Sequence, residues 1–195
     1  MISISISKTA ETLAWLIGIV YATIPAYWLA VHPFARFWQN RRGKVFPMLG
    51  LIWLALWIVA GVATAPYRHQ RFWPAWSWIA WLILFALAVR VYRKIGHFDR
   101  AKLLGQAEVR PQEHEQKLVT TGMHARVRHP IYLAHWLMLT SWTIGAGTIA
   151  LIGLWVLAVI TGVFMIVSED RELEARFGDE YRAYKQRVPA VIPRA

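Results

Sequence analysis

The sequence predicts an all-α protein: a polytopic membrane helix bundle of about five transmembrane helices, ending in a helical hairpin and an amphipathic tail helix. Three observations favour this class. The 195 residues are 57% hydrophobic and only 17% charged, with a mean hydropathy of +0.36, which is too apolar for an ordinary soluble domain. Long uncharged runs recur along the chain, and a membrane-spanning helix needs about 20 mostly apolar residues. Basic residues gather between these runs, as they do at the ends of membrane helices.

The expected spans follow the uncharged runs in order. The first three runs predict helices at about 13–31, 46–65 and 73–89. The last run, from Pro130 to Ser168, is about twice as long as one span requires. It therefore predicts a hairpin of two helices, 130–144 and 149–167, with a glycine-containing turn between them. A polar segment, 93–129, precedes this hairpin and a charged tail, 168–195, follows it, and we expect all these parts to form one membrane domain, 1–195.

The charge distribution predicts an orientation. The formal net charge is +11, from 22 Lys and Arg against 11 Asp and Glu. With five spans, Lys8, Arg68 and Arg71 fall on one side of the membrane and the other 19 basic residues (22 minus 3) on the opposite side. The positive-inside rule then places the N-terminus outside and the C-terminus in the cytoplasm, in a bacterial-type inner membrane or its equivalent. The lipid bilayer, and not a nucleic acid, is the expected partner of these charges; no oligomeric state is indicated. Met1 to Glu11 lacks the positive n-region of a signal peptide, so the first span is expected in the mature protein.

The segment Gly122 to Tyr132, G-M-H-A-R-V-R-H-P-I-Y, stands at the start of the hairpin. Proline is tolerated in the first turn of a helix, so His129-Pro130 predicts the entry to the fourth span. The N-terminus of such a helix attracts anions, and Arg126 and Arg128 add two positive charges. A basic membrane anchor at the foot of the helix is the alternative interpretation.

The two feet of a helical hairpin lie close together, so two charged clusters should meet on the cytoplasmic side. Mutual salt bridges are one outcome. The other outcome is a site for a zwitterion such as S-adenosylmethionine. The basic cluster would bind its carboxylate, and an acidic residue would bind its ammonium group. The basic cluster is Arg126, Arg128 and His129, and the acidic cluster is Glu169, Asp170 and Glu172.

Other chemistry has less support in the sequence. The absence of cysteine excludes thiolate catalysis and Cys-ligated zinc. Acids and histidines 97, 114 and 124 are scattered through the polar segment without a metal-ligand spacing, so no metal site is expected. His135 lies inside the fourth span, where an ionisable residue is either functional or a helix-to-helix hydrogen-bonding group.

Two linked motifs resemble those of a known enzyme superfamily. The pattern L-V-x-x-G-x-x-x-x-x-R-H-P-x-Y runs from Leu118 to Tyr132. After the hairpin come an acidic pair and F-G-D-E-Y-x-x-Y-x-x-x-V-P, from Phe177 to Pro189. Together they are similar to the isoprenylcysteine carboxyl methyltransferase and phospholipid methyltransferase superfamily of integral membrane enzymes. The resemblance covers about the C-terminal 80 residues, whereas the first three spans match only in hydropathy.

The resemblance implies an S-adenosylmethionine-dependent methyltransferase acting on a lipid-like or other apolar small acceptor. It also implies the cofactor-binding residues, which are Lys117, Leu118, Val119, His124, Arg128, His129, Pro130, Ile131, Tyr132 and Glu169. The expected catalytic residues are His129, Tyr132 and His124. An amine acceptor would require a base, for which His129, His124 or His135 could serve, whereas a carboxylate or thiolate acceptor would not.

The chain departs from the superfamily's pattern at two positions. His124 stands where the family usually has an aromatic hydroxyl, and Met165 stands where prenylcysteine enzymes have an arginine implied to hold the substrate carboxylate. The second departure weakens the prenylcysteine interpretation, because a carboxylate acceptor loses its cationic partner.

Two other function classes remain open from the sequence. Membrane reductases of the sterol-reductase kind have a similar C-terminal hairpin and tail. If this chain were such an enzyme, the basic cluster at the foot of its hairpin would hold the phosphates of NADPH. A non-enzymatic membrane scaffold or transporter subunit would use the charged ends only as anchors.

Overall fold

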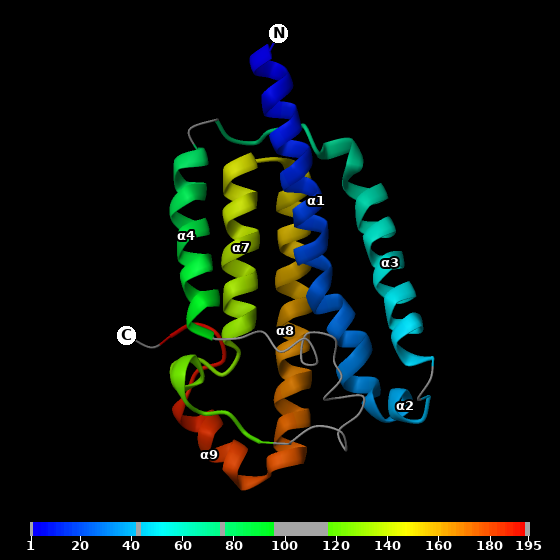
Figure 1. Cartoon of the computed structure of the whole chain (residues 1–195), viewed down its shortest axis with the longest axis vertical. Helices are drawn as coiled ribbons and strands as arrows, with labels where there is room; N and C mark the ends of the chain where they lie inside the picture. The colour runs from blue at the N-terminus through cyan, green and yellow to red at the C-terminus, as the bar shows by residue number, and fades with distance from the viewer. Residues whose placement is uncertain (1, 42–43, 75–76, 96–116, 194–195) are drawn as a thin grey trace.

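A computed structural model describes residues 2–41, 44–74, 77–95 and 117–193, with the side chains of residues 2–6 left aside. Five long helices stand side by side (Figure 1): α1 (Ile2–Val31), α3 (Val45–Thr64), α4 (Ser77–Ile95), α7 (Pro130–Ala146) and α8 (Ile149–Phe177). The shorter elements are η1 (His32–Phe34), α2 (Ala35–Gln39), η2 (Ala65–Tyr67), η4 (Gly122–Ala125) and α9 (Asp179–Arg187). Within the described ranges no β-strand forms, and the all-α prediction is confirmed.

The membrane character of the bundle is visible in its surface. Helices α1, α3 and α8 are long and apolar enough to cross a membrane. Large apolar side chains remain exposed along α3 and α8, among them Leu51, Val62 and Phe164, as expected of surfaces that face lipid. The other two expected spans fall on α4 and α7, which have 19 and 17 residues.

The helix bounds differ from the expected spans in places. Helix α1 begins at Ile2, well before residue 13, and α4 is described from Ser77. Residues 70–73, which precede it, bond to the end of α7 and to the turn between α7 and α8. Helix α8 continues past residue 167 to Phe177. This last part carries six charged residues, so it projects beyond the apolar stretch: Glu169, Asp170, Arg171, Glu172, Glu174 and Arg176.

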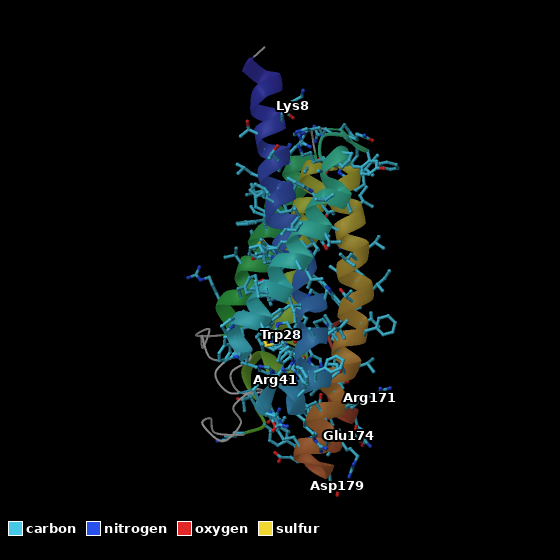
Figure 2. The ribbon with its side chains drawn as sticks, turned by 90° about the vertical axis from the view of Figure 1, so that its right-hand side faces the viewer. Lys8, Trp28, Arg41, Arg171, Glu174 and Asp179 are labelled. Carbon is cyan, nitrogen blue, oxygen red and sulfur yellow. The ribbon has the colours of Figure 1, made fainter. Side chains whose placement is uncertain are left out.

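Packing within the bundle joins α4 to α7, and α1 to α3, α7 and α8. The largest core cluster lies among α1, α7 and α8, where Leu139, Leu151 and Leu154 are almost fully buried. Seen from the side, Lys8 marks one end of the bundle, whereas Arg171, Glu174 and Asp179 mark the other (Figure 2). The hairpin is closed at the Lys8 end by Gly147, whose φ of 63° ends α7 in the left-handed conformation that glycine adopts readily.

One close contact between α4 and α7 leads to a prediction. A Cβ atom on Gly145 would lie 2.7 Å from Cβ of Trp81, so Gly145→Ala should overpack this contact and cost about 1–3 kcal/mol. The matched control is Gly153→Ala on α8, where an added Cβ meets nothing within 4 Å. Thermal unfolding of the detergent-solubilised variants checks this, and equal midpoints for both would contradict the described packing.

Candidate functional site

The foot of the hairpin is built by three segments that are distant in the sequence. Pro130 is the first residue of α7, and His129 is its N-cap. The backbone N–H groups of Arg128 and His129 donate to the carbonyls of Pro189 and Ala190, both at 2.9 Å. The tail after α9 therefore holds the entry to α7 in place, beside the charged part of α8.

His129 lies between two acids of α8. Its side chain is buried, with Nε2 2.8 Å from Oδ1 of Asp170 and Nδ1 3.3 Å from Oε2 of Glu169. The imidazole also stacks on the ring of Tyr132, one turn into α7, with 5.6 Å between ring centroids. The two predicted clusters thus do meet, and His129 is the residue that contacts both acids.

These contacts control the charge of His129. Burial by itself lowers the pKa of His129, but the carboxylates of Glu169 and Asp170 outweigh burial and raise the pKa to about 9. The imidazole is therefore a cation at neutral pH, with both of its nitrogens facing carboxylates.

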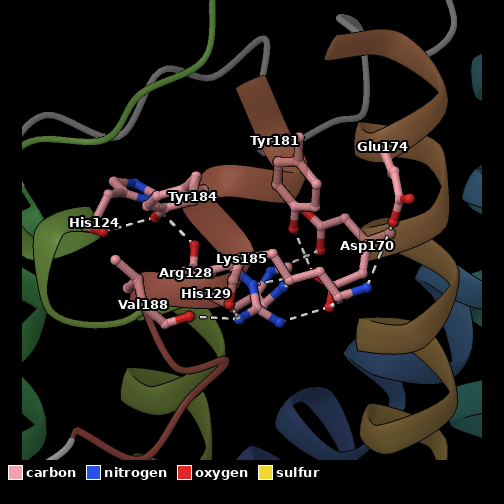
Figure 3. A network of polar contacts seen from close by, with 10 residues as sticks. His124, Arg128, His129, Asp170, Glu174, Tyr181, Tyr184, Lys185 and Val188 are labelled. Carbon is pink, nitrogen blue, oxygen red and sulfur yellow. Dashed lines mark hydrogen bonds and ion pairs between the residues drawn. The ribbon is translucent and has the colours of Figure 1, made fainter. Parts of the chain in front are cut away.

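Asp170 is the centre of a larger network (Figure 3). Arg128 donates to both of its oxygens, Nη2 at 2.6 Å from Oδ2 and Nε at 3.4 Å from Oδ1. The Tyr181 hydroxyl donates to Oδ1 as well, and Lys185 Nζ lies 3.7 Å from Oδ2. Arg128 also donates to the carbonyl of Val188, at 2.5 Å. The network therefore links α7, α8, α9 and the tail.

Glu169 has a different environment from its neighbour. No donor in the described part of the chain makes a hydrogen bond to its buried Oε2, although Nδ1 of His129 lies 3.3 Å away as an ion-pair partner. Burial by itself raises the pKa of Glu169, but His129, His32 and Tyr132 outweigh it and lower the pKa to about 2. Glu169 is thus an ionised carboxylate whose Oε2 pairs electrostatically with His129 but accepts no hydrogen bond from the described residues.

Comparison with known proteins identifies the family. A family model described as "Protein of unknown function (DUF1295)" matches residues 27–188. The chain belongs to this family. It is 31% identical over 168 residues to methanethiol S-methyltransferase 2 of Bradyrhizobium diazoefficiens, covering 81% of this chain and 54% of that protein. It is 29% identical over 131 residues to protein-S-isoprenylcysteine O-methyltransferase of Homo sapiens, covering 63% of this chain and 45% of that protein.

A shorter match, 41% identical over 59 residues, is to an uncharacterized protein of Haemophilus influenzae and covers 30% of this chain and 94% of that protein. The DUF1295 chain spans about half the length of the two methyltransferases. No solved structure matches it significantly. The family and its relatives place the chain in the isoprenylcysteine carboxyl methyltransferase-like membrane superfamily, so the resemblance found in the motifs is confirmed.

The remaining residues predicted for the site surround this foot. Leu118 packs against Tyr181 and Tyr184 of α9, whereas Lys117 and Val119 are exposed. His124, in η4, places Nδ1 3.1 Å from the carbonyl of Arg128, and its own carbonyl accepts from the Tyr184 hydroxyl at 2.6 Å. Pro130, Ile131 and Tyr132 form the first turn of α7, with Pro130 buried.

Some predictions fall outside the described residues. Residues 96–116 of the polar segment, including His97 and His114, lie outside them. Among the residues that are described, no group of His, Asp and Glu is arranged to hold a metal ion. The tail helix α9 packs on the protein itself, since its Tyr181 and Tyr184 are buried against Leu118 and against Leu173 of α8.

Sequence reasoning missed His32 and the central role of Asp170. His32 Nδ1 lies 2.6 Å from Oε2 of Glu172. A signal was present, because His32-Pro33 and His129-Pro130 are the two His-Pro dipeptides of the sequence. Each proline lies in the first turn of a helical segment, η1 or α7, and each histidine pairs with an acid of α8.

The charge of His129 predicts a pH dependence of stability. Because the pKa of His129 is raised in the folded state, its stabilising contribution is complete below its ordinary pKa of about 6.5 and is lost as the pH rises to about 9. The thermal midpoint in detergent should therefore fall across this window. His129→Gln should have a lower midpoint and a flatter profile over the same window. A wild-type midpoint that rises between these pH values would contradict the assignment.

Proposed function

We propose that this chain is an integral membrane methyltransferase that uses S-adenosylmethionine to methylate a lipid-like or other apolar small acceptor. The observation that carries the proposal is Glu169, an ionised carboxylate whose buried Oε2 has no hydrogen-bond donor in the described part of the protein. Such an oxygen is costly to bury unless a ligand supplies a donor. The methyltransferase names of the relatives support the same class.

The residues at the foot of the hairpin fit the amino-acid part of S-adenosylmethionine. Glu169 would accept hydrogen bonds from its ammonium. The N-terminus of α7 and the cationic His129 would attract its carboxylate. We propose that the other predicted site residues line the same site, namely Lys117, Leu118, Val119, His124, Arg128, Pro130, Ile131 and Tyr132.

When bound, S-adenosylmethionine supplies a methyl group on a sulfonium, which is already a good leaving group, so the protein must mainly position the reactants and exclude water. The hydroxyl of Tyr132 stabilises the carboxylate of Glu169 and so helps to hold it for the ligand. His129 is a cation between two acids, so its role is to bind and orient. No covalent nucleophile is required.

The proposed acceptor is apolar because the side chains above Glu169 are apolar. Met165, one turn before Glu169 on α8, is fully buried in a cluster to which Trp28 and Tyr132 belong. The relatives are named for methanethiol and for protein S-isoprenylcysteine. Met165 supplies no cation for a carboxylate, which favours an acceptor that is neutral when it arrives. An acceptor with an apolar tail would enter sideways from the bilayer.

The orientation belongs to the same proposal. We propose that residues 1–195 form a single domain. Its N-terminus would lie outside and the feet of the hairpin in the cytoplasm, where S-adenosylmethionine would reach them. Positive charges on the side of the membrane that holds Glu169 support this orientation.

Calorimetry with S-adenosylhomocysteine on detergent-purified protein tests the proposed function. Saturable binding at micromolar to millimolar ligand is expected. No binding at millimolar concentration would refute the proposal. Saturable binding of NADPH without binding of S-adenosylhomocysteine would favour a membrane reductase instead.

A further inference from the structure

The connection between α1 and α3 forms a surface outside the site described above. Between these two apolar helices, each long enough to cross a membrane, the chain passes through η1 and α2. Helix α2 lies at the same end of the bundle as α9 (Figure 1). A short connection between two spans lies at the depth of the lipid headgroups, because both spans leave the hydrocarbon there.

The inner side of α2 is fixed to the bundle by Trp38. Its side chain is buried, and its indole N–H donates to the carbonyl of Ala30 at 2.7 Å. It belongs to a core cluster with Val31, at the end of α1, and Val45, at the start of α3. The opposite side of α2 is therefore held facing outwards.

The outer side combines aromatic rings with cations. Phe34 and Phe37 are 57% and 44% exposed. The guanidinium of Arg41 lies 4.1 Å from the centre of the Phe37 ring, within the range of a cation–π contact. Exposed aromatic rings beside cations are typical of segments that lie in the membrane interface. The exposed residues form what we term the α2 surface: Phe34, Arg36, Phe37, Arg41 and Lys44.

The cations of the α2 surface differ from the other arginines at this end of the bundle. Arg128, Arg176 and Arg182 each pair with an acid of α8 or α9. No ion pair among the described residues joins an acid to the α2 surface, and the sequence contains no acid between Glu11 and Asp99. The positive charge of the α2 surface is thus not balanced by this part of the protein.

We propose that the α2 surface is a binding site for anionic phospholipids. The rings of Phe34 and Phe37 enter the boundary of the acyl chains. The three cations, Arg36, Arg41 and Lys44, bind the headgroup phosphates, for which the planar guanidinium of arginine is well suited. The positive-inside rule concerns the side of the membrane on which cations lie, whereas a preference among lipids requires cations held together on a fixed surface. This inference is independent of methyl transfer.

The test uses full-length protein in detergent micelles, with phosphatidylglycerol and phosphatidylcholine as probes. Because the protein has no cysteine, Asn40→Cys provides a single position, exposed and next to Arg41, for an environment-sensitive fluorophore. Phosphatidylglycerol should change the fluorescence saturably, with an affinity at least about 10-fold above that of phosphatidylcholine. Each cation removed should lower this affinity about 5-fold, so Arg36→Gln combined with Arg41→Gln should lower it about 25-fold.

The matched control is Arg171→Gln, because Arg171 is also exposed and lies at the same end of the bundle (Figure 2). It should leave the affinity unchanged, and an effect equal to that of the double variant would overturn the inference. Equal affinities for the two lipids would do so as well. Glycerol 3-phosphate should not compete at the concentration of the lipid, and equal competition would indicate a site for free phosphate esters instead. If the double variant does not fold, the 5-fold loss in Arg36→Gln decides.

Discussion

Replacement of Asp170 with alanine should destabilise the protein by about 3–5 kcal/mol, because it leaves a buried cation without its partner. Arg128 is 8% exposed and its guanidinium bonds to both oxygens of Asp170, which also accepts from His129 and Tyr181. The thermal midpoint in detergent should therefore fall by roughly 10 °C for a chain of this size. Loss of tryptophan fluorescence on heating provides the measurement.

The matched control for this prediction is Asp179→Ala. Asp179 also pairs with an arginine, Arg182, at 2.6 Å, but its side chain is 96% exposed. Exposed ion pairs contribute about 0–1 kcal/mol, so the midpoint should move little. Arg128→Met combined with Asp170→Asn should cost less than the sum of the two single changes, since the cation is removed with its partner. Equal effects of Asp170→Ala and Asp179→Ala would refute the role of the network in holding the fold.

Replacement of Glu169 with glutamine should weaken binding of S-adenosylhomocysteine by about 10-fold or more. Hydrogen bonds to a charged group contribute about 1.5–3 kcal/mol, and 1.4 kcal/mol corresponds to a factor of ten in affinity. Stability should change much less than in Asp170→Ala, because His129 and Arg128 keep their bonds to Asp170. Calorimetry measures the affinity, and the thermal midpoint shows that the variant is folded.

Glu174→Gln is the control for this change. Glu174 lies on the same helix and pairs with Arg182 and Lys185 at 3.4 and 3.7 Å, but not with His129. The affinity of the Glu174→Gln variant for S-adenosylhomocysteine should equal that of the wild type. A wild-type affinity in Glu169→Gln would move the cofactor site away from Glu169, even if the chain remains a methyltransferase.

The all-helical fold could be predicted from the sequence because it depends on local composition. A run such as 46–65 without charge is long enough to cross a bilayer wherever it occurs, and α3 covers almost the same residues. The start of α7 could also be predicted from local sequence, since proline is favoured at the first position of a helix and Pro130 takes that position. The meeting of the hairpin's two feet followed from the short turn between two antiparallel helices.

The different roles of two neighbouring acids could not be predicted in this way. Glu169 and Asp170 are adjacent in the sequence, but successive residues of a helix point about 100° apart. Asp170 therefore faces Arg128 and Tyr181, whereas Glu169 faces His129 through Oε2, an oxygen that accepts no hydrogen bond from the described residues. Only the positions of α7, α9 and the tail around α8 decide which acid holds the fold.

The sequence by itself determined the membrane bundle, the hairpin and the superfamily, because hydropathy and motif spacing are properties of the chain. The tertiary structure alone decided what surrounds each charge. His32 and Glu172 are 140 residues apart and become partners only because the end of α1 packs on α8. The environment of a buried ionisable group is set by whichever elements pack against it, and such contacts leave no periodicity in the sequence.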